Sequence, residues 1–225
     1  MPSFDIIRKT DVDRTFRVAS VMSDFDIRPE QCAEHFKGEL NLPNDWHIGI
    51  IYGGSGTGKT TIARELFGDD VITHFEYTAK SVIDDMPKSC STTEIEQMFY
   101  AVGFGSVPSW LKPYSVLSNG EKMRVDLARA LLERPFVVFD EFTSVVDRNV
   151  AKTASIAVAK AIRRTGKKFI AVSCHKDIIQ YLQPDWQFCT DDMSWSFTTA
   201  HDQKKSSPSE VVGLSNGGNL GDIII

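Results

Sequence analysis

The feature that most constrains this chain is the run from Gly53 to Thr60, GGSGTGKT, with Thr61 directly behind it. The run matches the phosphate-binding pattern GxxxxGK[ST]. Residues 48–52 before it are mostly β-branched, and residues 60–67 after it have the apolar spacing of a helix. The run therefore lies between an expected strand and an expected helix, which favours a phosphate-holding loop over an ordinary glycine-rich turn.

The residue types of this loop suit a triphosphate. Glycines let successive backbone N–H groups turn inward around an anion, the helix N-terminus adds its dipole, and Lys59 supplies a positive charge. Thr60 would place its hydroxyl on Mg²⁺. We therefore expect a nucleoside triphosphate to be held by Gly53, Gly54, Ser55, Gly56, Thr57, Gly58, Lys59, Thr60 and Thr61.

Length and composition indicate one globular domain, since the chain has 225 residues, of which 42% are hydrophobic and 24% charged. A net charge of −5 argues against a generally basic nucleic-acid surface and leaves a local basic patch open. The four cysteines form no CxxC pair and no zinc-like spacing, which suits reduced thiols in a cytoplasm. No apolar run approaches the roughly 18 residues of a membrane span, so we expect no intrinsic membrane segment.

The stretch before the phosphate loop is predicted to be β-rich, with strands over residues 4–7, 16–22, 39–42 and 48–51. An aromatic side chain in this lobe could cover a purine ring. Phe25 is the first candidate and Phe16 the second, although a place in the core explains Phe25 equally well.

After the first helix we expect a strand over residues 71–77 and a helix over 94–102 that Thr92 or Thr93 caps. Residues 103–114 contain too much Gly and Pro for a regular element, and a long irregular loop of this kind is often functional. Insertion of Trp110 into the core is the other explanation.

A second strong signal is Ser118-Asn119-Gly120-Glu121, which precedes a long amphipathic stretch. Ser118 can cap that helix, and Glu121 three residues later completes a capping box. The box is a sufficient structural explanation. A helix N-terminus topped by Ser, Asn and Gly is also an anion site, so these residues could face a phosphate.

Two carboxylates, Asp140 and Glu141, follow the apolar run 136–139, which predicts a buried parallel strand that ends in acids. Asp140 is placed to hold the hydration shell of Mg²⁺, and Glu141 to act as general base toward water. A pair of surface acids is the alternative. Residues 149–164 are predicted to form a helix in the most basic part of the chain, which a solvated face explains better than a nucleic-acid patch.

Residues 168–173 predict another buried strand, and His175 stands just past its end, where it can reach a γ-phosphate. Residues 186–198 are expected to form a last strand or hairpin. The stretch 199–225 has little apolar content before its final three isoleucines and is predicted to be a mobile tail.

With these residues in place, the chain resembles the ATP-binding-cassette (ABC) ATPase family from about residue 16 to residue 185. The motifs follow the family order: the Walker A loop at 53–61, the signature motif at 117–121, the Walker B strand at 137–141, the D-loop at 144–147 and the switch histidine at His175. Phe25 falls where the family has its adenine-stacking aromatic residue. Some segments of the sequence resemble those of soluble bacterial and phage ABC-type ATPases that are sometimes fused to GNAT-type acetyltransferases.

The resemblance implies an α/β P-loop NTPase with a mixed sheet. One domain would cover residues 1–198, with an antiparallel adenine lobe at 1–47, the P-loop core at 48–80 and 117–190, and a reduced helical subdomain at 81–116. It also implies Mg²⁺-dependent ATP hydrolysis in a head-to-tail dimer with a second copy of the chain. Glu141, His175, Lys59 and Asp147 would be catalytic, and Ser118, Asn119, Gly120 and Glu121 would act on the nucleotide of the other copy.

Two departures from the family pattern matter. Asn119 stands where the signature usually has Gly, and Asn adopts left-handed geometry at low cost. Only 56 residues separate Thr60 from Leu117, and no clear glutamine loop is present. Residues 77–84 occupy its place, where Lys80 or Asp84 could substitute.

The reduced segment argues against transport. Our first hypothesis is therefore a soluble cytoplasmic ABC-type ATPase, with nucleic acid or an effector protein as open partner classes. The alternatives are the nucleotide-binding subunit of a membrane transporter and a P-loop kinase acting on a small molecule or nucleoside. A kinase gives no role to residues 117–121.

Overall fold

The computed structural model describes residues 3–9, 15–28, 33–40, 42 and 45–198. The predicted tail at 199–225 lies outside the described residues, as does Cys32. Within the described part, no helix is both long enough and apolar enough to cross a bilayer.

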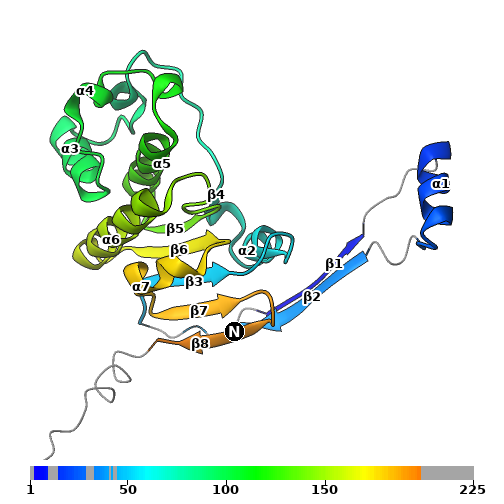
Figure 1. Cartoon of the computed structure of the whole chain (residues 1–225). Coiled ribbons are helices and arrows are strands. Elements are labelled where there is room, and N and C mark those ends of the chain that lie inside the picture. Colours follow the sequence, from blue (N-terminus) through cyan, green and yellow to red (C-terminus); the bar gives the residue numbers. More distant parts are fainter. Residues whose placement is uncertain (1–2, 10–14, 29–32, 41, 43–44, 199–225) are drawn as a thin grey trace, which may run out of the picture.

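A six-stranded sheet in the order β4-β5-β6-β3-β7-β8 forms the centre of the molecule (Figure 1). All neighbours in it pair in parallel except β7 and β8, which form an antiparallel hairpin. The mixed α/β sheet predicted from the sequence is thus confirmed. The strands are β3 (Ile48–Tyr52), β4 (Val71–Ile72), β5 (Phe136–Phe139), β6 (Lys168–Ser173), β7 (Trp186–Cys189) and β8 (Ser194–Phe197).

The two faces of this sheet are buried against different elements. On one face Ile50 and Phe169 belong to a core with α5 and α6, and on the other Ile51 and Ile170 belong to a core with α2. Burial on both faces explains why the strands read as continuous apolar runs. The helices of this body are α2 (Lys59–Phe67), α3 (Thr92–Ala101), α4 (Val107–Trp110), α5 (Asn119–Glu133), α6 (Arg148–Thr165) and α7 (Ile179–Leu182), and the short 3-10 turns are η2 (Gly68–Asp70), η3 (Val82–Asp85), η4 (Tyr114–Val116) and η5 (Lys176–Ile178).

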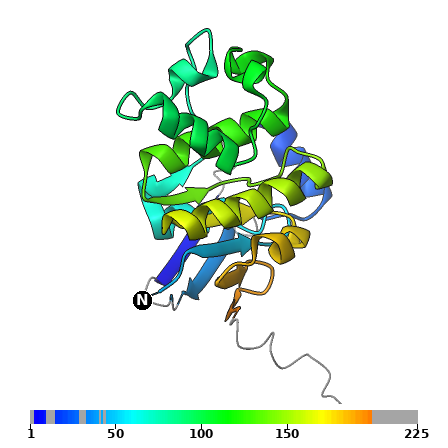
Figure 2. The ribbon, with the colours of Figure 1, turned by 90° about the vertical axis from the view of Figure 1, so that its left-hand side faces the viewer.

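The helices α3, α4 and α5 gather at the β4–β5 end of the sheet, opposite β8 (Figures 1 and 2). The irregular stretch 103–114 folds against them around α4. There Trp110 is 3% exposed and its Nε1–H donates to the carbonyl oxygen of Phe104 at 2.9 Å. Trp110 is therefore a core residue, the second of the two explanations that the sequence left open.

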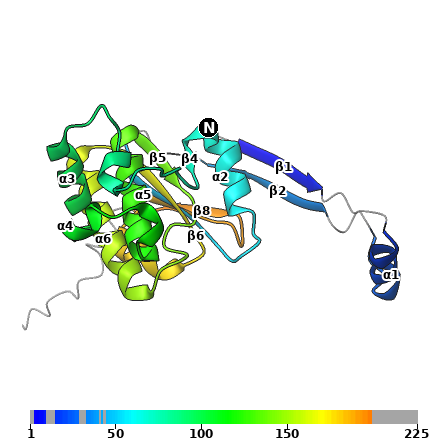
Figure 3. The same ribbon diagram turned by 90° about the horizontal axis from the view of Figure 1, so that it is seen from above.

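The N-terminal segment forms a separate antiparallel pair, β1 (Ser3–Lys9) with β2 (Ala33–Glu39). Figures 1 and 3 show that this pair projects from the body beside α2 and carries α1 (Phe16–Asp24) at its far end. The predicted strand over 16–22 is wrong, because Thr15 caps a helix there by accepting the N–H of Val18 at 3.3 Å. The predicted strand over 39–42 is also wrong, since β2 ends at Glu39.

Two other boundaries differ from the sequence-based predictions. Only Val71 and Ile72 of the expected strand 71–77 pair in the sheet. The helix expected over 94–102 begins at Thr92, and its N-cap is Ser91 rather than either threonine. Ser91 and Glu94 form a complete capping box, which fixes that start.

Candidate nucleotide site

The glycine-rich loop connects β3 to α2, as its sequence context predicted. Gly56 and Gly58 have φ values of +83° and +82°, which residues with a Cβ rarely adopt. A Cβ at Gly58 would also lie 2.6 Å from the ring of Phe36 on β2, so the loop and the β1–β2 pair approach each other closely. Lys59 Nζ donates to the carbonyl oxygen of Gly54, which holds the ammonium group across the loop.

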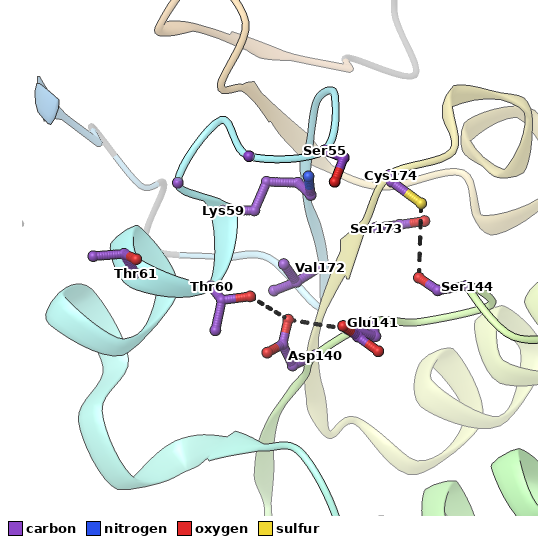
Figure 4. Close-up of a pocket in the computed structure, with 12 residues that line it drawn as sticks. Ser55, Lys59, Thr60, Thr61, Asp140, Glu141, Ser144, Val172, Ser173 and Cys174 are labelled. Atoms are coloured by element: carbon purple, nitrogen blue, oxygen red, sulfur yellow. Dashed lines mark hydrogen bonds between the residues drawn. The ribbon is translucent and has the colours of Figure 1, made fainter. Parts of the chain in front are cut away.

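Thr60 and Asp140 join the loop to the end of β5. The hydroxyl of Thr60 donates to Asp140 Oδ1 at 3.1 Å, and the N–H of Glu141 donates to the same oxygen at 3.0 Å. Figure 4 shows Asp140 between Thr60 and Glu141. Asp140 is 6% exposed, so its carboxylate is held in one place by these donors.

The turn after β5 has an unusual backbone. Glu141 and Thr143 adopt φ values of +52° and +65°, although neither is glycine. Thr143 is fully buried, and its hydroxyl has no hydrogen-bond partner. Two left-handed residues in three positions cost free energy, and such strain persists mainly where a functional geometry requires it.

These residues line a cavity of about 290 Å³. It gathers eight of the predicted site residues from the phosphate loop and from the end of β5. Of four further lining residues, Ser144 belongs to the expected D-loop and the other three were not predicted. The predicted residues are Ser55, Gly56, Gly58, Lys59, Thr60, Thr61, Asp140 and Glu141, and the further ones are Ser144, Val172, Ser173 and Cys174.

The donor set at this cavity fits Mg²⁺. Thr60 and Asp140 bring a hydroxyl and a carboxylate oxygen within 3.1 Å of each other, and Mg²⁺ prefers such hard oxygen ligands. The described residues contain no group of three or more His, Cys, Asp or Glu side chains that could hold a metal ion. The protein would thus supply only part of the coordination, as is usual where phosphates and water complete it.

His175 follows β6, as predicted, but the residue that lines the cavity is its neighbour Cys174. The N–H of His175 donates to the Ser173 hydroxyl at 3.1 Å, and Cys174 Sγ lies 3.3 Å from His175 Nδ1. The position at the carboxyl end of the sheet therefore agrees with the prediction. Contact between the ring and a γ-phosphate stays a prediction.

The structure does not bring Phe25 to the cavity. Phe25 is the C-cap of α1 and is 73% exposed, and α1 lies at the far end of the β1–β2 pair (Figure 1). Phe16 begins the same helix and is 89% exposed. The predicted strand 16–22 contained Phe16 and ended shortly before Phe25, and the helix that forms there instead lies away from the cavity.

The capping box predicted at residues 118–121 is confirmed. Glu121 N–H donates to Ser118 Oγ at 3.3 Å, and Ser118 N–H donates to Glu121 Oε2 at 2.9 Å. The second bond, with help from neighbouring hydroxyls, lowers the pKa of the Glu121 carboxyl. Asn119 is not among the residues with positive φ, so its tolerance of left-handed geometry is not used: it begins α5 as an ordinary helical residue.

The four residues 118–121 and Asp147 do not line the phosphate cavity of their own chain. Asp147 caps α6, where its carboxylate accepts the N–H groups of Asn149 and Val150 at 2.9 and 3.0 Å. Gly120 packs beside that helix, because a Cβ there would lie 3.1 Å from Val150 Cγ1. A role for these residues toward a nucleotide thus needs a second copy of the chain.

The segment expected to replace a glutamine loop is tied to α5 by Tyr77 rather than by Lys80 or Asp84. Tyr77 and Tyr114 stack with ring centroids 3.9 Å apart, and each hydroxyl donates to one oxygen of Asp126 at 2.7 Å. This cluster links the stretch after β4 to the helix that begins at Ser118.

Sequence reasoning missed Asp191, in the turn between β7 and β8. Its Oδ1 accepts the N–H of Gly54 at 2.6 Å, and the neighbouring Thr190 hydroxyl lies 2.5 Å from that of Thr57. No motif relates positions so far apart, and only the pairing of β3 with β7 brings them together.

Comparison with known proteins supports the fold. The chain matches no family model. It is 31% identical over 143 residues to an uncharacterized ABC transporter ATP-binding protein of Haemophilus influenzae, a match that covers 51% of this chain and 58% of the relative. Over these residues the chain is similar to an ABC transporter ATP-binding protein. It thus spans little more than half the length of this curated relative.

Two solved ABC structures share the fold. A dimeric ABC cassette in a post-hydrolysis state with ADP and Pi superposes with a TM-score of 0.58 at 14% identity, covering 74% of this chain and 93% of that one. CbiO1 from Clostridium perfringens, part of the cbiONQ transporter complex, gives 0.57 at 20% identity, covering 69% and 78%. The Haemophilus protein and CbiO1 are described as parts of ABC transporters, and the resemblance to acetyltransferase-fused ATPases finds no counterpart among the three proteins.

Proposed function

We propose that this chain is the ATP-hydrolysing cassette of an ABC system, and that it works as an ATP-gated head-to-tail dimer. The observation that carries this proposal is the Thr60–Asp140 hydrogen bond, with Glu141 directly beside it on the same cavity. A phosphate loop, a carboxylate suited to Mg²⁺ and a second carboxylate suited to activate water thereby meet at one place. This is the set of groups that phosphoryl transfer to water requires.

Thr60 and Asp140 would hold Mg²⁺, which when bound neutralises negative charge on the phosphates. The glycine-rich loop and Lys59 would orient the triphosphate through backbone N–H groups and one ammonium group. Glu141 would take a proton from the attacking water as general base. His175 would contact the γ-phosphate from the end of β6.

The proposed dimer gives a role to the predicted site residues that do not line the cavity of their own chain. Ser118, Asn119 and Gly120 stand at the N-terminus of a 15-residue helix, away from the cavity of their own chain. In a head-to-tail dimer they would close over the phosphates bound by the other copy, with Asp147 at the same interface. ATP would then favour the closed dimer and hydrolysis the open one, as for any ligand that binds one of two states more tightly.

The similar proteins change the class of partner that we favour for this chain. On sequence alone a soluble ATPase was the first hypothesis and transport the alternative. Because the similar proteins are described as transporter components, we now favour a cassette that acts at the cytoplasmic face of a membrane on a separate membrane protein. Co-purification from membranes with a genomic neighbour would support this partner. Recovery of the chain without any membrane protein would contradict it.

One observation favours a nucleic-acid partner as the second candidate. The 18 residues of α6 include five basic side chains and no acid, in a chain whose net charge is −5. ATPase rates with and without DNA or RNA at two salt concentrations test it, since phosphate contacts weaken steeply with salt. Equal rates throughout would remove this partner class.

Glu141→Gln tests the core of the proposal. The substitution keeps the shape of the side chain and removes the base, so ATP with Mg²⁺ should convert the variant into a dimer that light scattering detects. Lys59→Ala in the same background is the control and should stay monomeric. A Glu141→Gln variant that binds ATP and remains a monomer would sink the dimer mechanism. Transfer of phosphate to a small acceptor rather than water would instead support the kinase alternative.

A further inference from the structure

The turn between β7 and β8 holds the start of the phosphate loop. Asp191 in this turn accepts the Gly54 N–H at 2.6 Å, and Thr190 beside it is 2.5 Å from the Thr57 hydroxyl. A Cβ at Gly53 would lie 2.2 Å from Thr190 Oγ1, so the two backbones are in close contact. The loop is therefore fixed from the β7–β8 side as well as by its own strand and helix.

The same carboxylate also contacts the segment that carries the proposed switch histidine. Asp191 Oδ2 lies 3.4 Å from Nζ of Lys176, the residue directly after His175. Lys176 Nζ is in turn 5.4 Å from the ring centroid of Tyr52, the last residue of β3. One side chain thus has one oxygen on the phosphate loop and the other on the histidine segment.

The electrostatics of this arrangement keep Asp191 ionised. The Gly54 N–H, followed by Lys176 and Lys59, holds the pKa of the Asp191 carboxyl below its ordinary value. An anion near a triphosphate site repels the ligand, so its presence needs a compensating role. A charge-assisted hydrogen bond to a loop N–H supplies one, since such bonds are short and directional.

We propose that Asp191 is a positioning residue for nucleotide binding, which holds the phosphate loop through Gly54 and ties it to the histidine segment through Lys176. This inference depends on the proposed function in one respect, which is that the ligand is ATP. The motifs in the sequence identify neither Asp191 nor Lys176 as a residue that contacts the phosphate loop. The contact with Gly54 carries the larger effect, because the exposed ion pair with Lys176 is worth little by itself.

Three variants separate the two contacts. Asp191→Ala loses both contacts. Asp191→Asn keeps an oxygen that can accept the Gly54 N–H and loses the charge. Lys176→Met loses the ion pair, together with the contact to the Tyr52 ring, and leaves the Gly54 bond in place. Asp192→Asn is the matched control, because the Asp192 carboxylate accepts from Ser194 within its own turn rather than from the phosphate loop. We expect Asp191→Ala to raise both the Kd and the KM for ATP about tenfold, the order of one charge-assisted hydrogen bond.

For Asp191→Asn we expect affinity at or above that of the wild type, and for kcat a change within about twofold in every variant. Rescue by Asn distinguishes positioning from a simple charge effect. If Asp191→Ala and Asp191→Asn change the KM equally, or if Asp191→Ala behaves like Asp192→Asn, the inference is overturned.

Amide exchange in the nucleotide-free full-length protein measures the contact without any ATPase activity. The Gly54 amide should exchange faster in Asp191→Ala than in the wild type, and Asp191→Asn should restore protection. Unchanged exchange in Asp191→Ala overturns the inference. A wild type that shows this protection yet binds no ATP would overturn the proposed function and leave the positioning contact standing.

Discussion

At the scale of single residues, the Thr60 hydroxyl has two proposed uses, one for its proton and one for an oxygen lone pair. It donates to Asp140 in the structure, and as a Mg²⁺ ligand it would use an oxygen lone pair. Both uses are compatible, because the proton and the lone pairs point in different directions. The hydroxyl group, rather than the size of the side chain, is therefore what this position requires.

Thr60→Ala and Thr60→Ser test that requirement. Alanine removes the bond to the carboxylate and the metal ligand, so we expect the Mg²⁺ concentration for half-maximal ATPase activity to rise about tenfold, as for loss of one bond to a charged group. Serine keeps the hydroxyl and should stay within about twofold of the wild type. A Mg²⁺ titration that is identical for Thr60→Ala and the wild type would contradict this assignment.

Tyr77 offers a residue-scale prediction with a pH dependence. Burial raises the pKa of the Asp126 carboxyl, so this group contributes most stability below its ordinary pKa of about 4 and loses that contribution as pH rises through the raised value. Above that value the carboxylate is charged and needs the hydroxyls of both Tyr77 and Tyr114. Tyr77→Phe should therefore cost about 1–2 kcal/mol of unfolding free energy at about pH 8 and less at about pH 3, below the ordinary pKa of the carboxyl.

Urea unfolding at the two pH values measures this difference. Tyr100→Phe is the control, since Tyr100 is 57% exposed and its substitution should change stability by less than about 0.5 kcal/mol at either pH. Equal losses for Tyr77→Phe at both pH values would show that the hydroxyl does not respond to the charge on Asp126.

At the scale of elements, two helices in the described part of the chain begin with matched capping boxes that have different expected roles. Ser91 with Glu94 begins α3, and Ser118 with Glu121 begins α5. Ser91→Ala and Ser118→Ala should each lower the unfolding free energy by about 1 kcal/mol, the usual cost of a lost N-cap. Only Ser118→Ala should also weaken the ATP-dependent dimer of the Glu141→Gln variant in light scattering. Equal dimer loss in both would assign Ser118 to capping alone.

Elements with a local signal were predictable from the sequence. Each of these features depends on residues within a few positions of one another, so a local sequence pattern predicts it. They are the phosphate loop, the acids after β5 and the capping box at Ser118. The α1 helix shows the limit of such signals. Its apolar residues fit strand alternation and helix spacing alike, and the cap at Thr15 decided between them.

Other parts depended on contacts that no local pattern contains. The strand β4 ends after Ile72 because the following aromatic residues pack elsewhere: the Arg129 guanidinium lies 4.8 Å from the ring centroid of Phe75 and 5.1 Å from that of Tyr77. Asp191 reaches Gly54 only once β3 and β7 pair. The part of the candidate site that the sequence did not predict is thus the part formed by tertiary contacts.

At the scale of the whole molecule, the β1–β2 pair divides into a part that touches the body and a part that does not. Phe4 and Phe36 belong to the core beside α2, and Phe36 packs against Gly58 of the phosphate loop. By contrast, α1 has no buried residue. The near part of the pair should therefore support the nucleotide site, and α1 should not.

Joining Lys9 to Ala33 tests this division. These residues are paired partners in the antiparallel register, so an Asn-Gly turn can replace residues 10–32 and remove α1 with Phe16 and Phe25. Because the core and the cavity keep all their lining residues, we expect the melting temperature to fall by no more than a few degrees and the Kd for ATP to stay within about twofold. Calorimetry and titration with a fluorescent ATP analogue measure both.

As a control, Phe36→Ala should weaken ATP binding and stability together, since it opens a cavity beside Gly58. A shortened chain that melts normally but loses ATP affinity severalfold would mean that α1 closes over the nucleotide, and would return Phe25 to the adenine site.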